Sequence, residues 1–159
     1  MTMNEKTNVM RLLDAANIPY RSYTYDGAGG ALSGLEVARA LGQDADQVYK
    51  TLVTVGASGK NYVFVIPVAG ELNLKKAAQA VKEKKIEMLK ARDLLPLTGY
   101  IHGGCSPIGM KKLFPTVLDE SVILFATIIF SAGKIGFQVE LSPDDLQRMI
   151  PCTLFDVVD

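Results

Sequence analysis

The chain has 159 residues, enough for one domain with a hydrophobic core of its own. Its 17 Lys and Arg residues balance its 17 Asp and Glu residues, so net charge does not argue for nucleic acid, although a local basic patch is compatible with it. The chain has two cysteines, far apart in sequence, and one histidine, which are too few for a zinc site or a disulfide framework. Such sparse cysteine favours a reduced, cytoplasmic compartment. We expect no metal or other cofactor. We also expect no membrane partner, because the longest apolar run, 122–130, is too short to span one as a helix.

Apolar periodicity and the turn signals between the periodic segments predict short helices mixed with strands, several of them joined by hairpins. This order argues for an α+β fold with a mixed sheet rather than a regular parallel βαβ arrangement. No repeat or linker interrupts the chain, so a single domain over residues 1–159 is expected. In chain order, the expected elements are a helix over 4–16, a strand over 20–25, a loop over 26–30, a helix over 34–41, strands over 47–55 and 62–68, a helix over 74–81, a charged amphipathic segment over 82–90, a turn over 93–99, the end of a buried strand at 100–101, strands over 116–118, 127–130 and 137–141, and a helix over 143–150.

The helix expected over 34–41 begins with a recognisable capping signal. Ser33 and Glu36 fit the S-x-x-E capping box, in which each residue satisfies a backbone N–H of the other. Glu36 has a second interpretation, as a contact for the amine of a substrate. Spacing alone favours the cap.

Lys50 stands in the middle of an apolar, β-branched strand, on the same face as Val48 and Leu52. Lysine is rarely buried without a partner. It could extend its ammonium to solvent from an edge strand, or protect that edge from aggregation. Alternatively, it points into a cleft and binds a phosphate or a carbonyl oxygen.

The densest basic cluster of the chain is formed by Lys82, Lys84 and Lys85. Such a run is usually the solvated face of a helix. Its other interpretation is a contact with the phosphate backbone of a nucleic acid. The sequence leaves both interpretations open.

Residues 99–109, Gly-Tyr-Ile-His-Gly-Gly-Cys-Ser-Pro-Ile-Gly, form the most distinctive stretch of the chain. Glycine permits positive φ and close approach, and proline restricts the residue before it. Clusters of this kind usually mark an ordinary turn. They can also present several backbone N–H groups at one point, where an anion or a polarised carbonyl oxygen would bind.

Recognisable nucleophile motifs are missing from the sequence, which has no G-x-S-x-G elbow, phosphate-binding loop or dinucleotide fingerprint. His102 and Cys105 suggest a Cys–His nucleophile, but no neighbouring acid is spaced to orient the histidine, which disfavours that interpretation. The remaining groups could position a substrate that supplies its own nucleophile, or could position a water molecule.

Three segments together resemble the YbaK/EbsC family of aminoacyl-tRNA deacylases, which is related to the editing domain of bacterial prolyl-tRNA synthetases. They are Val48–Val53 (VYKTLV), Pro67–Lys76 (PVAGELNLKK) and Gly99–Gly109, and the likeness continues through Thr127 to Leu141. Each motif alone is weak, whereas the ordered set is fairly specific and covers nearly the whole chain. The resemblance implies a largely antiparallel, barrel-like sheet surrounded by short helices.

The resemblance also implies trans-editing, the hydrolysis of mischarged aminoacyl-tRNA, with cysteinyl-tRNA(Pro) as substrate and prolyl-tRNA synthetase as a further partner. Lys50 matches the family lysine expected to hold the substrate near its terminal adenosine and ester, and Thr51 follows it. In such enzymes the cysteine thiol of the substrate attacks the ester. The other matched positions are the loop residues Gly103, Gly104, Cys105, Ser106 and Pro107, whose backbone would orient the ester carbonyl, together with Tyr25 and Ser131.

Several positions depart from the family pattern. Gln138 stands where an aspartate can occur, Ser33 where an aromatic residue can occur, and His102 and Cys105 at usually aliphatic loop positions. These departures bear on amino-acid specificity more than on fold. Two other functions therefore stay open: an alanyl- or seryl-tRNA deacylase that uses a positioned water, and a binding module for tRNA or nucleotide without catalytic activity.

Overall fold

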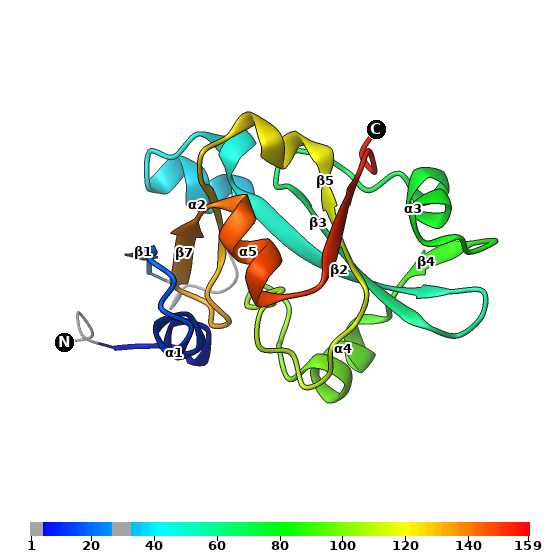
Figure 1. Cartoon of the computed structure of the whole chain (residues 1–159), viewed down its shortest axis with the longest axis horizontal. Coiled ribbons are helices and arrows are strands. Elements are labelled where there is room, and N and C mark those ends of the chain that lie inside the picture. The colour runs from blue at the N-terminus through cyan, green and yellow to red at the C-terminus, as the bar shows by residue number, and fades with distance from the viewer. Residues whose placement is uncertain (1–4, 27–32) are drawn as a thin grey trace.

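Two β-sheets lie side by side in the computed structural model, which describes residues 5–26 and 33–159 (Figure 1). The three-stranded sheet has the order β1-β7-β6, and the five-stranded sheet has the order β4-β2-β3-β5-β8. The strands are β1 (Arg21–Thr24), β2 (Tyr49–Gly56), β3 (Asn61–Pro67), β4 (Ile86–Met88), β5 (Thr116–Asp119), β6 (Ile128–Ser131), β7 (Phe137–Leu141) and β8 (Cys152–Phe155). The helices are α1 (Asn8–Ala15), α2 (Gly34–Ala40), α3 (Leu74–Val81), α4 (Ala91–Thr98) and α5 (Pro143–Met149), with 3-10 helices over Ala45–Gln47 and Glu120–Leu124.

Strand pairing within the described residues is mixed and mainly antiparallel, as expected. β2 pairs antiparallel with β3 and β4, and β7 pairs antiparallel with β1 and β6, whereas β3–β5 and β5–β8 are parallel. The expected barrel is wrong, because the two sheets do not close on each other. A single parallel bridge between Val48 and Ile129 connects them, after which β2 diverges from β6.

Four helices begin at the polar residues that the sequence offers as caps. The side-chain oxygens of Thr7, Ser33, Asn73 and Ser142 each accept a hydrogen bond from the backbone N–H three residues later, at 3.0–3.3 Å. The Glu36 carboxylate accepts from the Ser33 N–H at 2.9 Å, which completes the predicted capping box. Glu36 is therefore a capping residue. Residue 4, at the start of the first expected helix, and residues 27–30 of the loop expected over 26–30 lie outside the described residues.

The main hydrophobic core lies between the two sheets and under α1 and α5. It brings together Leu13, Val65, Phe130, Leu141 and Leu146, all of them 0–1% exposed. Because these residues come from both sheets and both helices, the core holds the sheets together where hydrogen bonds do not. Burial of such side chains contributes about 2 kcal/mol each.

The segment from 82 to 101 differs most from the sequence-based expectation. A strand, β4, replaces the amphipathic charged segment, and Ile86 is buried there while Met88 is 46% exposed rather than turned inward. The expected turn over 93–99 is the helix α4, which accommodates Pro96. No strand ends at Tyr100 and Ile101 either; Tyr100 is buried and its hydroxyl donates to the Ile108 carbonyl, whereas Ile101 is 52% exposed.

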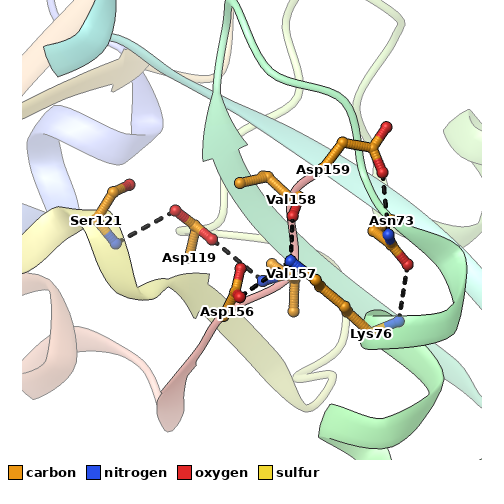
Figure 2. Close-up of polar contacts among 8 residues, drawn as sticks. All are labelled: Asn73, Lys76, Asp119, Ser121, Asp156, Val157, Val158 and Asp159. Carbon is orange, nitrogen blue, oxygen red and sulfur yellow. Dashed lines mark hydrogen bonds and ion pairs between the residues drawn. The ribbon is translucent and has the colours of Figure 1, made fainter.

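The C-terminal segment is anchored by a buried carboxylate, and the sequence analysis predicted neither this anchor nor β8. Asp119, at the end of β5, accepts hydrogen bonds from the N–H groups of Ser121 and Val157, both at 3.2 Å (Figure 2). Lys76 of α3 donates to the Asp156 carboxylate at 3.0 Å and to the Val158 carbonyl at 2.8 Å. We call this set of contacts the C-terminal anchor.

Candidate functional site

A pocket of about 440 Å³ opens at the edge of β2, where the strand has left β6 and has not yet met β4. The bridge to β6 ends at Val48, and the first residue paired with β4 is Thr54. Residues 49–52 between these points are paired with β3 alone, and residues 49–53 form one wall of the pocket. The divergence of the two sheets therefore creates the site.

Lys50 lines this pocket and is half-buried. Although β2 is an inner strand of the five-stranded sheet, the stretch that carries Lys50 is paired on one side only, and it lines the pocket. Within the described residues its ammonium has no hydrogen bond or ion pair, whereas Lys6, Lys76, Lys85 and Lys134 each pair with a carboxylate. A cation without a counterion at the wall of a pocket can receive a phosphate, a carboxylate or a carbonyl oxygen.

Thr51 follows Lys50 and presents a second unused polar group. Its hydroxyl oxygen is buried and has no hydrogen-bond partner in the structure. Thr51 lies on the strand edge that bonds β4 further along, where the Leu89 N–H donates to the Val53 carbonyl at 3.1 Å. Because burying a hydroxyl without a partner is costly, this group is suited to a ligand that supplies the missing hydrogen bond.

Residues 99–109, which we call the glycine loop, contribute two of the predicted site residues to the pocket wall, Gly103 and Cys105. Gly103 has φ +88°, a backbone conformation that favours glycine. The Gly104 N–H donates to the Ile101 carbonyl at 3.0 Å and closes the turn. A Cβ on Gly104 would lie 3.3 Å from the Ile135 nitrogen, so glycine lets the loop pack against the 131–136 turn.

Ser106 and Pro107 are buried behind the wall and do not line the pocket. The Ser106 hydroxyl accepts from the Ile108 N–H at 3.4 Å, and so supports the loop from within. Among the loop residues that line the pocket, the backbone N–H groups of His102, Gly103 and Cys105 have no hydrogen bond within the described residues.

The Cys105 thiol is not suited to act as a nucleophile. Burial raises its pKa from 9.0 to about 12, so it stays protonated near neutral pH. His102 also lines the pocket but is exposed. The structure therefore provides no activated Cys–His pair.

The wall formed by the three-stranded sheet contains Ser131 and Gln138, which face each other in the β6–β7 register. The Ser131 hydroxyl accepts from the Gly133 N–H at 3.1 Å. Gln138 is 5% exposed, and its side-chain oxygen accepts from the Gln43 amide at 2.8 Å. Tyr25 joins this wall at the end of β1, where its N–H donates to the Gly136 carbonyl at 2.9 Å.

One apolar wall was not anticipated from the sequence. It consists of Met88 of β4, Leu89 directly after that strand, and Ala91 and Leu94 of α4, and Leu35 of α2 adds to the apolar lining. The sequence gives only a weak indication of the two elements that form it, because β4 has three residues and α4 contains a proline. The wall provides a surface on which a base or another apolar group can pack.

The pocket lining contains one lysine, one histidine and no aspartate or glutamate within the described residues. No group of three or more His, Cys, Asp or Glu side chains could hold a metal ion in that part of the chain. No helix among residues 5–26 and 33–159 is long and apolar enough to cross a membrane. The site therefore combines hydrogen-bond donors and hydroxyls, without a carboxylate base.

Comparisons with known proteins agree with this geometry. A family profile described as an aminoacyl-tRNA editing domain matches residues 31–149. EbsC of Enterococcus faecalis, named as a candidate Cys-tRNA(Pro)/Cys-tRNA(Cys) deacylase, is 49% identical over 140 residues, which cover 88% of this chain and 85% of EbsC. A proline–tRNA ligase of Shouchella clausii is 29% identical over 102 residues, covering 64% of this chain and 18% of the ligase.

The fold has solved counterparts. The crystal structure of a candidate trans-editing enzyme for prolyl-tRNA synthetase matches with a TM-score of 0.79 at 22% identity, covering 96% of this chain and 98% of that chain. At this identity the likeness shows the fold alone.

Together, these findings define a class of enzyme, the aminoacyl-tRNA deacylases, which hydrolyse the ester between an amino acid and its tRNA. The chain belongs to the aminoacyl-tRNA editing domain family, and the resemblance to its YbaK/EbsC members is confirmed.

Proposed function

We propose that this protein deacylates cysteinyl-tRNA(Pro) in trans, in the cytoplasm and beside prolyl-tRNA synthetase. The observation that carries this proposal is the unpaired lysine, Lys50, in a pocket whose described lining has no carboxylate. The 49% identity to EbsC supports the choice of substrate. The 29% identity over 102 residues to a proline–tRNA ligase supports the link to the synthetase.

The proposed chemistry uses the substrate's own thiol as the nucleophile. The cysteine sulfur attacks the ester carbonyl carbon, the bond from that carbon to the terminal ribose oxygen breaks, and the thiol proton passes to that oxygen. The amino acid leaves as a thiolactone, which water then opens. This scheme is consistent with a site that has no carboxylate base and whose own thiol, Cys105, has a pKa of about 12.

The residues of the chain then have positioning and electrostatic roles. Lys50 holds the terminal adenosine next to the ester, and Thr51 bonds the same part of the substrate. The backbone N–H groups of Gly103 and Cys105 face the carbonyl oxygen, where negative charge develops during attack. Gly104, Ser106 and Pro107 hold the loop in shape, and Tyr25 and Ser131 complete the opposite wall.

Deacylation of cysteinyl-tRNA(Pro) beside alanyl-tRNA(Pro), with analysis of the released product, tests this proposal. We expect rapid release of cysteine, with thiolactone trapped by an added amine, and little release of alanine. Rapid loss of alanine as the free amino acid would instead indicate a deacylase that positions a water. Binding without turnover of either substrate would indicate a non-catalytic tRNA-binding module.

A further inference from the structure

The zero net charge of the chain conceals a strong separation of charge along the sequence. Residues 49–112 contain eleven Lys and Arg residues and four Asp and Glu residues, whereas the remainder contains six and thirteen. The positive part comprises β2, β3, α3, β4, α4 and the glycine loop, which occupy the right and lower parts of Figure 1. Outside the C-terminal anchor, where Asp156 pairs with Lys76 of α3, this flank of the molecule has an excess of positive charge that attracts polyanions.

Within this flank, the segment from 82 to 92 carries exposed cations with few counterions. Lys84, Lys90 and Arg92 are exposed and form no ion pair within the described part of the chain. Lys85 is different, because it pairs with Glu87 at 2.9 Å. The carboxylate of Glu83, the other acid among these residues, is bound by the hydroxyls of Ser58 and Tyr62. We call Lys84, Lys90 and Arg92 the basic rim.

The basic rim runs from the mouth of the pocket towards the β2–β3 hairpin, where the Ala57 N–H donates to the Lys85 carbonyl at 2.9 Å, next to Lys84. Met88, Leu89 and Ala91 line the pocket, and Lys90 lies between them in sequence, with Arg92 directly after. Lys90 is also the residue at which α4 begins. A polymer whose end occupies the pocket can therefore run along this segment.

We propose that the basic rim binds the phosphate backbone of the tRNA acceptor duplex whose 3′ end enters the pocket. This inference rests on the proposed function and adds the surface that receives the rest of the substrate. Exposed Lys and Arg side chains bind RNA phosphates through charge and counterion release, without reading the base sequence. The acidic remainder of the chain disfavours the opposite approach and so orients the duplex on this flank.

The test compares two RNA substrates and two sets of variants. The first set is Lys84→Ala, Lys90→Ala and Arg92→Ala, singly and combined, and the matched control is Arg11→Ala combined with Arg148→Ala on the other flank. Arg11 and Arg148 are exposed, on α1 and α5. Each protein is assayed with full-length cysteinyl-tRNA(Pro) and with a cysteinyl ester of the single-stranded CCA trinucleotide, over a range of salt concentrations.

We expect the triple variant to lose about ten-fold or more in kcat/KM on full-length tRNA, through KM, and to keep the wild-type rate on the trinucleotide ester. The slope of log(kcat/KM) against log[salt] should become shallower by about one for each cation removed. The control variant should match the wild type on both substrates. Equal activity of the triple variant and the wild type on full-length tRNA would overturn the proposal.

Binding of an uncharged acceptor minihelix with a CCA end, followed by fluorescence anisotropy, separates this proposal from the proposed function. If the wild type hydrolyses no ester but binds the minihelix in a manner that depends on the basic rim, the catalytic proposal fails and the surface stands. If minihelix binding is unchanged in the triple variant, the surface proposal fails. Loss confined to assays that contain the synthetase would assign the rim to a protein partner and would also overturn the RNA assignment.

Discussion

The pocket and the C-terminal anchor differ in whether their polar side chains have hydrogen-bond partners. In the anchor, Asp119 accepts from two backbone N–H groups, and Lys76 is bonded both to Asp156 and to the Val158 carbonyl (Figure 2). In the pocket, the Thr51 hydroxyl is buried without a partner, and Lys50 has none within the described residues. The satisfied groups of the anchor maintain the fold, whereas under the proposed function the unsatisfied groups of the pocket are available to the substrate.

The largest expected effect is that of Lys50→Ala on catalysis. Since Lys50 has no hydrogen bond or ion pair to lose within the described residues, we expect deacylation of cysteinyl-tRNA(Pro) to fall by about 10²–10³-fold with little change in the free energy of unfolding. Single-turnover deacylation and urea unfolding measure the two quantities. Lys75→Ala, an exposed lysine of α3, is the control and should keep the wild-type rate. An unchanged rate in Lys50→Ala would contradict its role.

The converse is expected for Asp119→Ala in the anchor. Its removal leaves the buried N–H of Val157 and the N–H of Ser121 without an acceptor, so stability should fall by about 3 kcal/mol. Urea unfolding would detect this loss, and Asp119→Asn should show a smaller one because it keeps an acceptor. The activity per folded molecule should not change. A destabilisation below about 0.5 kcal/mol would show that the anchor is not structural.

Thr51→Val and Thr54→Val give the sharpest comparison, since they make the same change on the same strand. Thr51→Val removes a hydroxyl that has no partner, so stability should stay the same or rise by about 1 kcal/mol, while activity falls about ten-fold. Thr54 donates to the Tyr62 carbonyl at 2.9 Å, so Thr54→Val should cost about 1 kcal/mol and leave activity intact. Thermal unfolding and deacylation assays would show whether the two effects separate in this way.

The smallest expected effect concerns the pKa of Cys105, raised from 9.0 to about 12 by burial. The folded state then holds its proton where the unfolded state loses it, so this group stabilises the fold below pH 9 and that stability is lost as the pH rises towards 12. In a Cys152→Ser background, iodoacetamide at pH 8 should modify the folded protein at least ten-fold more slowly than the unfolded protein. Rapid modification of the folded protein would mean that the thiol is more available than its burial implies.

Local signals carried much of the prediction from sequence. The capped helices, the hairpin of β2 and β3 and the strand over 137–141 each follow from residues that are neighbours in the chain. Elements that depend on distant partners were missed. β8 is a strand because it pairs with β5, and β4 is a strand because it pairs with β2. A segment of three or four residues is too short for its sequence pattern to predict such a pairing.

The candidate site divides in the same way. Lys50 could be singled out from the sequence because a lysine in an apolar strand is anomalous by itself. The loop could be identified by its glycines, but not the division of its residues into Gly103 and Cys105 at the wall and Ser106 and Pro107 behind it. That division depends on how the loop packs against the turn over 131–136.

The sequence by itself thus determined the family resemblance, the helix caps and the anomalous lysine, because these features lie in short stretches of chain. Only the tertiary structure decided that the two sheets stay open, that a bridge at Val48, just before β2, joins them, and that the pocket forms where they diverge. The physical reason is that a pocket is made by the divergence of segments far apart in sequence, and no local pattern encodes the distance between them.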